Sequence, residues 1–72
     1  MGSPYYISRR LGIYADDRHL YQHDNFANWP GGNTEITYHR AKKLVQNGHG
    51  WSDYEARRII YQALDFSVLD DN

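Results

Sequence analysis

Two histidines four residues apart are the first groups in this chain that could do chemistry. His19 and His23, followed by Asp24, would place two imidazoles on one face of a helix, as zinc sites require. In a strand the same side chains would share a face but stand about 13 Å apart, too far for one metal ion. A metalloprotease motif would also have glutamate after the first histidine, where this chain has Leu20. We therefore expect no metal site.

The serines and glycines match no catalytic or phosphate-binding motif. The chain has no cysteine, and Ser8, Ser52 and Ser67 lack the glycine context of a nucleophile elbow. Gly31 and Gly32 are not followed by Lys-Ser or Lys-Thr, as a phosphate-binding loop would be. A chain of 72 residues has little material for a water-excluding pocket beside its core. The sequence predicts a protein that is not an enzyme and has no cofactor.

Cationic side chains gather on one side of the segment 34–47. They are His39, Arg40, Lys42 and Lys43, and Arg58 in the next segment could extend them. Such a row can follow the phosphate backbone of a nucleic acid. The net charge of −1 weakens this interpretation, because nucleic-acid binders are usually basic overall. The simpler interpretation is an ordinary solvated helix face.

The order strand, helix, helix over residues 34–66 resembles that of ribbon-helix-helix repressors. In that family, strands from the two chains of a dimer pair and enter the major groove. The resemblance covers about half of the chain and implies a dimeric DNA-binding protein whose strand is Thr34–Thr37. This strand lacks the alternating basic or amide side chains that read bases, and the family has no N-terminal hairpin of this kind.

Seven tyrosines and two tryptophans favour a different kind of surface. Tyr, Trp and Arg are enriched at the energetic centres of protein interfaces. Arg57 and Tyr61, four residues apart on a helix flank, can stack on each other. The outward face of a hairpin and the loop 24–33 supply the other candidates, Tyr5, Tyr6, Tyr14 and Trp29. The alternative is that a small core simply uses large side chains.

These residues together predict a small protein-binding module that docks on a larger protein or nucleoprotein complex. In size and composition the chain is similar to the small inhibitors encoded by phages and mobile elements, such as anti-CRISPR and anti-restriction proteins. The alternative function is the DNA-binding dimer. We expect a monomer or homodimer inside the cell, away from membranes, because no apolar run reaches the roughly 18 residues of a membrane span and no disulfide could stabilise a secreted domain.

The strongest structural signal is Trp51–Leu64. Ser52 and Glu55 match a capping box. The apolar residues that follow recur with helical spacing and form one stripe: Ala56, Ile59, Ile60, Ala63 and Leu64. A second amphipathic helix is expected within 34–47, capped by Thr34 or Thr37 at its start and by Gly48 at its end. The C-terminal half is therefore an αα-hairpin.

The N-terminal half has β-branched and aromatic residues without helical spacing. We expect a hairpin with a strand over Pro4–Ala15, a bulge at Gly12, a turn at 16–18 and a return strand at His19–His23. A short helix over 16–23 is the alternative. The loop 24–33 would either place Phe26 and Trp29 over the core or expose them for binding.

The predicted fold is a single α+β domain over residues 4–69, with residues 1–3 and 70–72 as disordered ends. The N-terminal β-hairpin, with or without a third short strand, packs against the C-terminal αα-hairpin. A bare two-stranded hairpin is marginal in stability, so the fold needs either that third strand or a partner chain.

Overall fold

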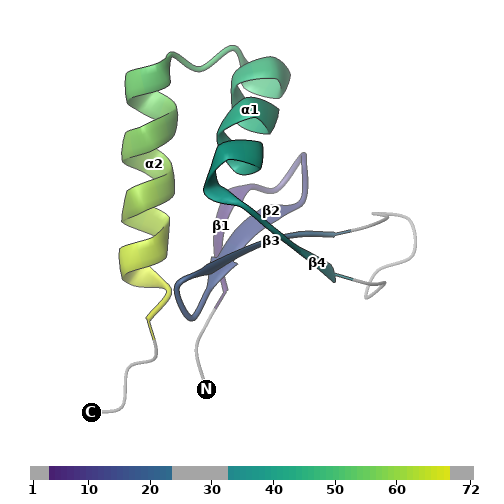
Figure 1. The fold of residues 1–72 in the computed structure, drawn as a ribbon, viewed down its shortest axis with the longest axis vertical. Coiled ribbons are helices and arrows are strands. Elements are labelled where there is room, and N and C mark those ends of the chain that lie inside the picture. The colour runs from purple at the N-terminus through teal and green to yellow at the C-terminus, as the bar shows by residue number, and fades with distance from the viewer. Residues whose placement is uncertain (1–3, 24–32, 69–72) are drawn as a thin grey trace.

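The computed structural model describes residues 4–23 and 33–68, which form one antiparallel sheet and two helices (Figure 1). The strands are β1 (Tyr5–Ser8), β2 (Ile13–Asp16), β3 (His19–His23) and β4 (Asn33–Ile36), and they pair in chain order. The helices are α1 (Tyr38–His49) and α2 (Asp53–Phe66). The predicted α+β class, with strands first and a helical hairpin last, is confirmed.

The strand predicted over Pro4–Ala15 is two strands, β1 and β2. The chain reverses between Ser8 and Ile13, where Gly12 has φ +72° and donates its N–H to the carbonyl of Arg9 at 3.2 Å. The prediction of a bulge at Gly12 is therefore wrong, because this glycine supplies the left-handed residue of a turn. With β4 added, the sheet has four strands instead of two or three.

The turn between β2 and β3 is confirmed, and the helical alternative for this segment is wrong. Its two residues, Asp17 (φ +50°) and Arg18 (φ +67°), both have positive φ. This geometry suits the twist of a hairpin, but Asn and Gly usually adopt it because other side chains are strained there. The strained backbone must therefore be held by contacts from elsewhere in the chain.

Ser67, which directly follows α2, holds that turn. Its carbonyl accepts the N–H of Asp17 at 2.8 Å, and its hydroxyl oxygen accepts the N–H of Arg18 at 3.0 Å. The Ser67 hydroxyl donates to the carbonyl of Leu64 at 2.8 Å. Ser67 is fully buried, and these bonds satisfy the polar groups that burial would otherwise penalise.

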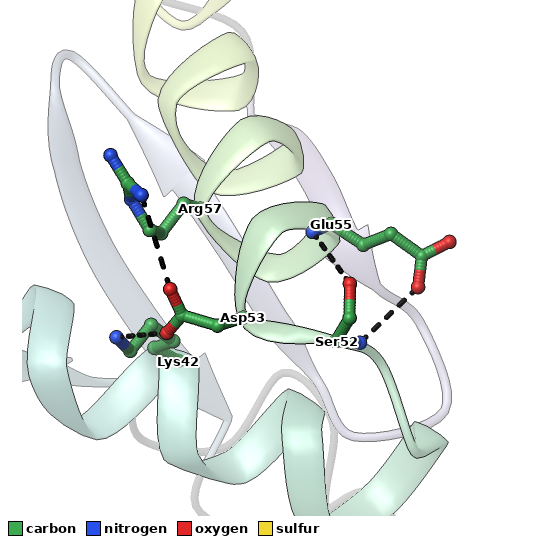
Figure 2. A network of polar contacts seen from close by, with 5 residues as sticks. All are labelled: Lys42, Ser52, Asp53, Glu55 and Arg57. Carbon is green, nitrogen blue, oxygen red and sulfur yellow. Dashed lines mark hydrogen bonds and ion pairs between the residues drawn. The ribbon is translucent and has the colours of Figure 1, made fainter.

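Local capping fixes where both helices begin. Ser52 and Glu55 form the predicted capping box, with N···O distances of 3.1 and 3.2 Å (Figure 2). Thr37 caps α1 by accepting the N–H of Arg40 at 3.1 Å. Of the two predicted caps for this helix, Thr37 is therefore the one used, and Thr34 belongs to β4.

The end of α1 lies two residues beyond the predicted cap. Gly50, with φ +73°, takes the left-handed position and donates to the carbonyl of Gln46 at 2.9 Å. Gly48 is still helical, and a Cβ at this position would lie 2.7 Å from a methyl group of Leu11. Gly48 thus lies where α1 packs closely on the Leu11 side chain of the β1–β2 turn, and its prediction as the cap is wrong because Gly50 caps the helix.

Both helices stand side by side on one face of the sheet (Figure 1). Apolar side chains from both layers form the core: Ile7, Ile13, Ala15, Leu20, Ile36, Ala41, Val45, Ala56, Ile60 and Ala63. Ile13 and Ile60 are completely buried, and α2 contacts both β1 and β2. The predicted stripe of α2 is thus the surface on which the sheet packs.

Some sequence predictions lie outside the described residues. These include the loop 24–32 with Phe26 and Trp29, the ends 1–3 and 70–72, and the last domain residue, 69. The domain boundaries therefore stay a prediction. Neither of the two described helices is long and apolar enough to cross a membrane.

Candidate functional site

Four side chains of α2 line a groove on the outer surface of the helix, away from the sheet. They are Tyr54, Arg57, Arg58 and Tyr61, and the groove has a volume of about 250 Å³. The spacing of three, four and seven residues places them on one side of the helix. Both rings are open to solvent, since Tyr54 is 67% and Tyr61 is 53% exposed. We call these four residues the Tyr–Arg groove.

Tyr61 is oriented by a neighbour on the other helix. Its ring stacks on that of Tyr38 in α1, with centroids 5.1 Å apart and an interplanar angle of 26°. Burial raises the pKa of Tyr38, and the nearby Tyr61 hydroxyl adds to this effect. Tyr61 therefore has one well-supported ring face, while more than half of its surface stays available to a partner.

Asp53 connects the groove to α1. One carboxylate oxygen lies 2.5 Å from Lys42 Nζ, and the other lies 3.9 Å from Arg57 Nη1 (Figure 2). The hydrogen bond from Lys42 lowers the pKa of Asp53, and the charges of Lys42 and Arg57 act in the same direction. Asp53 is therefore ionised at neutral pH and shared between two cations.

The cationic residues predicted to follow a nucleic acid do not all lie on one surface, because only His39, Arg40 and Lys43 share a side of α1. Arg40 and Lys42 are about 160° apart around the axis of α1, and Lys42 is paired with Asp53. His39, Arg40 and Lys43 are exposed on α1, whereas Arg58 belongs to the groove on α2. The strand implied by the ribbon-helix-helix resemblance, now β4, pairs with β3 of the same chain, a different arrangement from a two-chain ribbon.

A row of tyrosines crosses the sheet face opposite to the helices. Tyr6, Tyr14 and Tyr21 lie directly across from one another on β1, β2 and β3. The ring centroids are 5.4 Å apart for the first pair and 5.5 Å for the second, which is stacked at 20°. Tyr14, in the middle, is only 7% exposed. We call these three residues the tyrosine row.

The Tyr6 end of the tyrosine row is also occupied. The guanidinium of Arg9 lies 4.5 Å over the ring of Tyr6, and the Tyr6 hydroxyl is 3.1 Å from His23 Nε2. The His23 ring in turn lies 5.0 Å from that of Tyr14. Each ring of the row therefore has a neighbour within the chain, and the central ring, that of Tyr14, keeps little surface for a ligand to stack on.

Tyr5 does not share this face, so its predicted outward position is wrong. Adjacent strand residues point to opposite faces, and Tyr5 lies across from the core residue Ala15. Its ring is 5.3 Å from that of Phe66 in α2, and it is 40% exposed. Tyr6 and Tyr14 do lie on the outward face, but Tyr14 is covered by its neighbours.

A serine and a histidine that are distant in the sequence meet between β1 and the end of α1. Ser8 Oγ lies 2.6 Å from His49 Nε2 and accepts the N–H of Leu11 at 3.1 Å. Arg10 Nη2 lies 3.2 Å from His49 Nδ1 and also donates to the carbonyl of Gly48. The His49 ring stacks on the Trp51 ring, with centroids 4.8 Å apart.

The direction of these hydrogen bonds is the opposite of that in a catalytic serine–histidine pair. Arginine can only donate, so His49 Nδ1 accepts from Arg10 and Nε2 carries the proton. His49 then donates to Ser8, whereas a general base must accept the serine proton. The geometry therefore suits a structural link between the sheet and the helical hairpin.

His19 and His23 both belong to β3, the strand arrangement in which we expect them to be too far apart to share a metal ion. His19 Nδ1 is 2.9 Å from Glu35 Oε2, and His23 Nδ1 is 2.7 Å from Asn33 Oδ1, so each contacts β4. In the part of the chain that the structure describes, no group of three His, Asp or Glu side chains is arranged to hold a metal.

The sequence analysis named three of the four groove residues, but not as one group. Arg57 and Tyr61 are protein-binding candidates, and Arg58 is a nucleic-acid candidate. Tyr54 was missed, although its spacing of seven from Tyr61 and four from Arg58 is visible in the sequence. Ser8 and His49, 41 residues apart, carry no sequence signal that pairs them.

Comparisons of the chain with protein-family models, with curated proteins and with solved structures gave no match.

Proposed function

We propose that this protein is a non-enzymatic module that docks on a larger protein through the Tyr–Arg groove. The observation that carries the proposal is the gathering of two exposed tyrosines and two arginines on the outer surface of α2. These residue types contribute most to protein interfaces when they are clustered. Tyr61 is already stacked on Tyr38, so less side-chain entropy is lost when a partner binds.

The nucleic-acid alternative has weaker support. Lys42 is committed to an ion pair with Asp53, which leaves His39, Arg40 and Lys43 as a short cationic group on one side of α1. Phosphate binding depends on several cations acting along one backbone. A docking module of this kind would be able to inhibit a larger complex, which is the role of the phage-encoded inhibitors of similar size.

Affinity capture with matched variants tests the proposal. The groove variant carries Tyr54→Ser and Tyr61→Ser, and the control carries Arg40→Ser and Lys43→Ser on α1. We expect proteins from the source cell to bind the wild type and the control alike. The groove variant should bind them about 30-fold more weakly, the effect of losing roughly 2 kcal/mol at an interface hot spot. Circular dichroism verifies that both variants are folded.

Two outcomes would contradict docking through the groove. In the first, the groove variant retains every protein that the wild type retains. In the second, only the α1 control loses binding, and labelled duplex DNA binds the wild type with an affinity that falls steeply with salt. The second result would favour the nucleic-acid function.

A further inference from the structure

The Tyr–Arg groove has more positive than negative charge at its N-terminal end. Lys42 and Arg57 share a single carboxylate, that of Asp53, and the Lys42 contact is the shorter one. Arg58 forms no ion pair or hydrogen bond with any residue that the structure describes. At least one guanidinium is thus left for an anion from outside the chain.

The other acidic residues of α2 do not fill this place. Glu55 is held by the backbone N–H of Ser52 and points away from Arg57, on the opposite side of the helix (Figure 2). Asp65 is exposed one turn beyond Tyr61, at the far end of the groove. An incoming anion would therefore meet two carboxylates, that of Asp53, which Lys42 and Arg57 already share, and that of Asp65 at the far end of the groove.

Aromatic rings border the charged part of the groove. Tyr54 precedes Arg58 by four residues and Tyr61 follows it by three, so both are its neighbours on the helix surface. When a ligand covers these rings, water is displaced from beside the guanidinium and its attraction for an anion becomes stronger. The planar guanidinium matches the two oxygens of a carboxylate.

We propose that the groove receives an acidic segment of the partner protein, in which a glutamate or aspartate binds Arg58 and an adjacent apolar side chain lies against Tyr54 and Tyr61. This inference rests on the proposed docking function and adds the chemistry of the partner. A volume of about 250 Å³ suits one or two side chains. A nucleic acid would need a longer row of cations, which Arg40 and Lys43 do not provide because they are on the other helix.

Side-chain NMR with two probe peptides tests the partner chemistry directly. The acidic probe is a capped Gly-Ser-Glu-Glu-Leu-Ser-Gly peptide, and the neutral probe has Gln-Gln in place of Glu-Glu. We expect the acidic probe to shift the Nε–H signals of Arg57 and Arg58 and the ring signals of Tyr54 and Tyr61. The neutral probe should bind about tenfold more weakly. Salt at about 0.5 M should weaken only the acidic probe, because it screens charges.

Matched variants separate the groove from general electrostatic attraction. Arg58→Gln should abolish the preference for the acidic probe, whereas Arg40→Gln, the same substitution on α1, should leave it unchanged. The inference is overturned if both probes bind equally, if shifts concentrate at Arg40, or if no shift occurs at millimolar peptide. If capture still depends on Tyr54 and Tyr61 in that case, the docking function stands and only its acidic partner is rejected. If capture ignores both tyrosines, the docking function itself fails.

Discussion

The two faces of the sheet bury their side chains in different ways. On one face, Leu20 and Ile36 lie under helices that contribute Ile60 and two alanines of α2 to the same core. On the other, no described helix covers the strands, yet Tyr14 is more buried than Ile36 and nearly as buried as Leu20. Its neighbours Tyr6 and Tyr21 cover it from the adjacent strands.

This difference shows why residue type alone does not identify a binding surface. Tyr14 and Tyr54 are both tyrosines on an outer surface, but their neighbours differ. Strand register places rings on both sides of Tyr14, so its faces are occupied within the chain. Tyr54 is on the outer side of a helix with arginines beside it, and it stays 67% exposed. The aromatic surface available to a partner is therefore on α2.

The largest effect on stability is expected on the helix-covered face. Ile60→Ala should lower the free energy of unfolding by about 3 kcal/mol, because it leaves a cavity between α2 and the sheet. Urea unfolding followed by circular dichroism measures this change. Ile59→Ala, at a half-buried position of the same helix, is the control and should cost clearly less. Equal losses would mean that the two helix positions contribute similarly to the core.

A smaller effect is expected for Tyr14→Leu on the open face. Leucine keeps apolar volume but loses the contacts between rings, which contribute about 0.5–1.5 kcal/mol for each pair. We expect a loss of roughly 2 kcal/mol in urea unfolding, since Tyr14 has more than one ring neighbour. Tyr54→Leu is the matched control and should change stability by less than about 0.5 kcal/mol. If the two variants were alike, the tyrosine row would contribute little to the fold.

The smallest effect is expected for Tyr14→Phe, and only in alkali. Burial raises the pKa of Tyr14 above the ordinary value of 10.0, with Tyr6, Asp16 and Tyr21 adding to the shift. The unfolded chain then loses this proton first, so the free energy of unfolding falls as the pH rises above 10. Tyr14→Phe should reduce that fall and change little at neutral pH. The remaining decrease in the free energy of unfolding comes from groups such as Tyr38, whose pKa is also raised.

Urea unfolding of wild type and Tyr14→Phe at a series of alkaline pH values checks this prediction. Tyr54→Phe is the control, because it removes a hydroxyl from a tyrosine that is exposed instead of buried. Identical pH profiles for wild type and Tyr14→Phe would show that Tyr14 ionises as easily in the folded protein as in the unfolded chain.

The sequence predicted best those features that depend on neighbouring residues. The capping box at Ser52 and the apolar stripe of α2 are local patterns, and both are confirmed. The turn after Asp16 is local as well. The division of Pro4–Ala15 into two strands was missed, because the residues on both sides of Gly12 favour strands equally.

Features that depend on contacts between distant segments could not be predicted. The prediction of Gly48 as a helix cap is wrong because the sequence does not show that Leu11 packs against it. The bond between Ser8 and His49 likewise exists only after the sheet and helices have assembled. The Tyr–Arg groove could be predicted only in part. Its helical spacing is readable, but the exposure of Tyr54 depends on which side of α2 the sheet covers.

The contacts of Ser67 also affect how the chain folds while it is being synthesised. Ribosomes synthesise proteins from the N-terminus, so Asp17 and Arg18 exist well before Ser67 does. Until α2 is complete, the N–H groups of this strained turn lack the serine that accepts them in the folded protein. The sheet therefore cannot reach its final stability strand by strand during translation. Its last stabilising bonds form only when the end of α2 is in place, so the β2–β3 turn and α2 reach their final stability together.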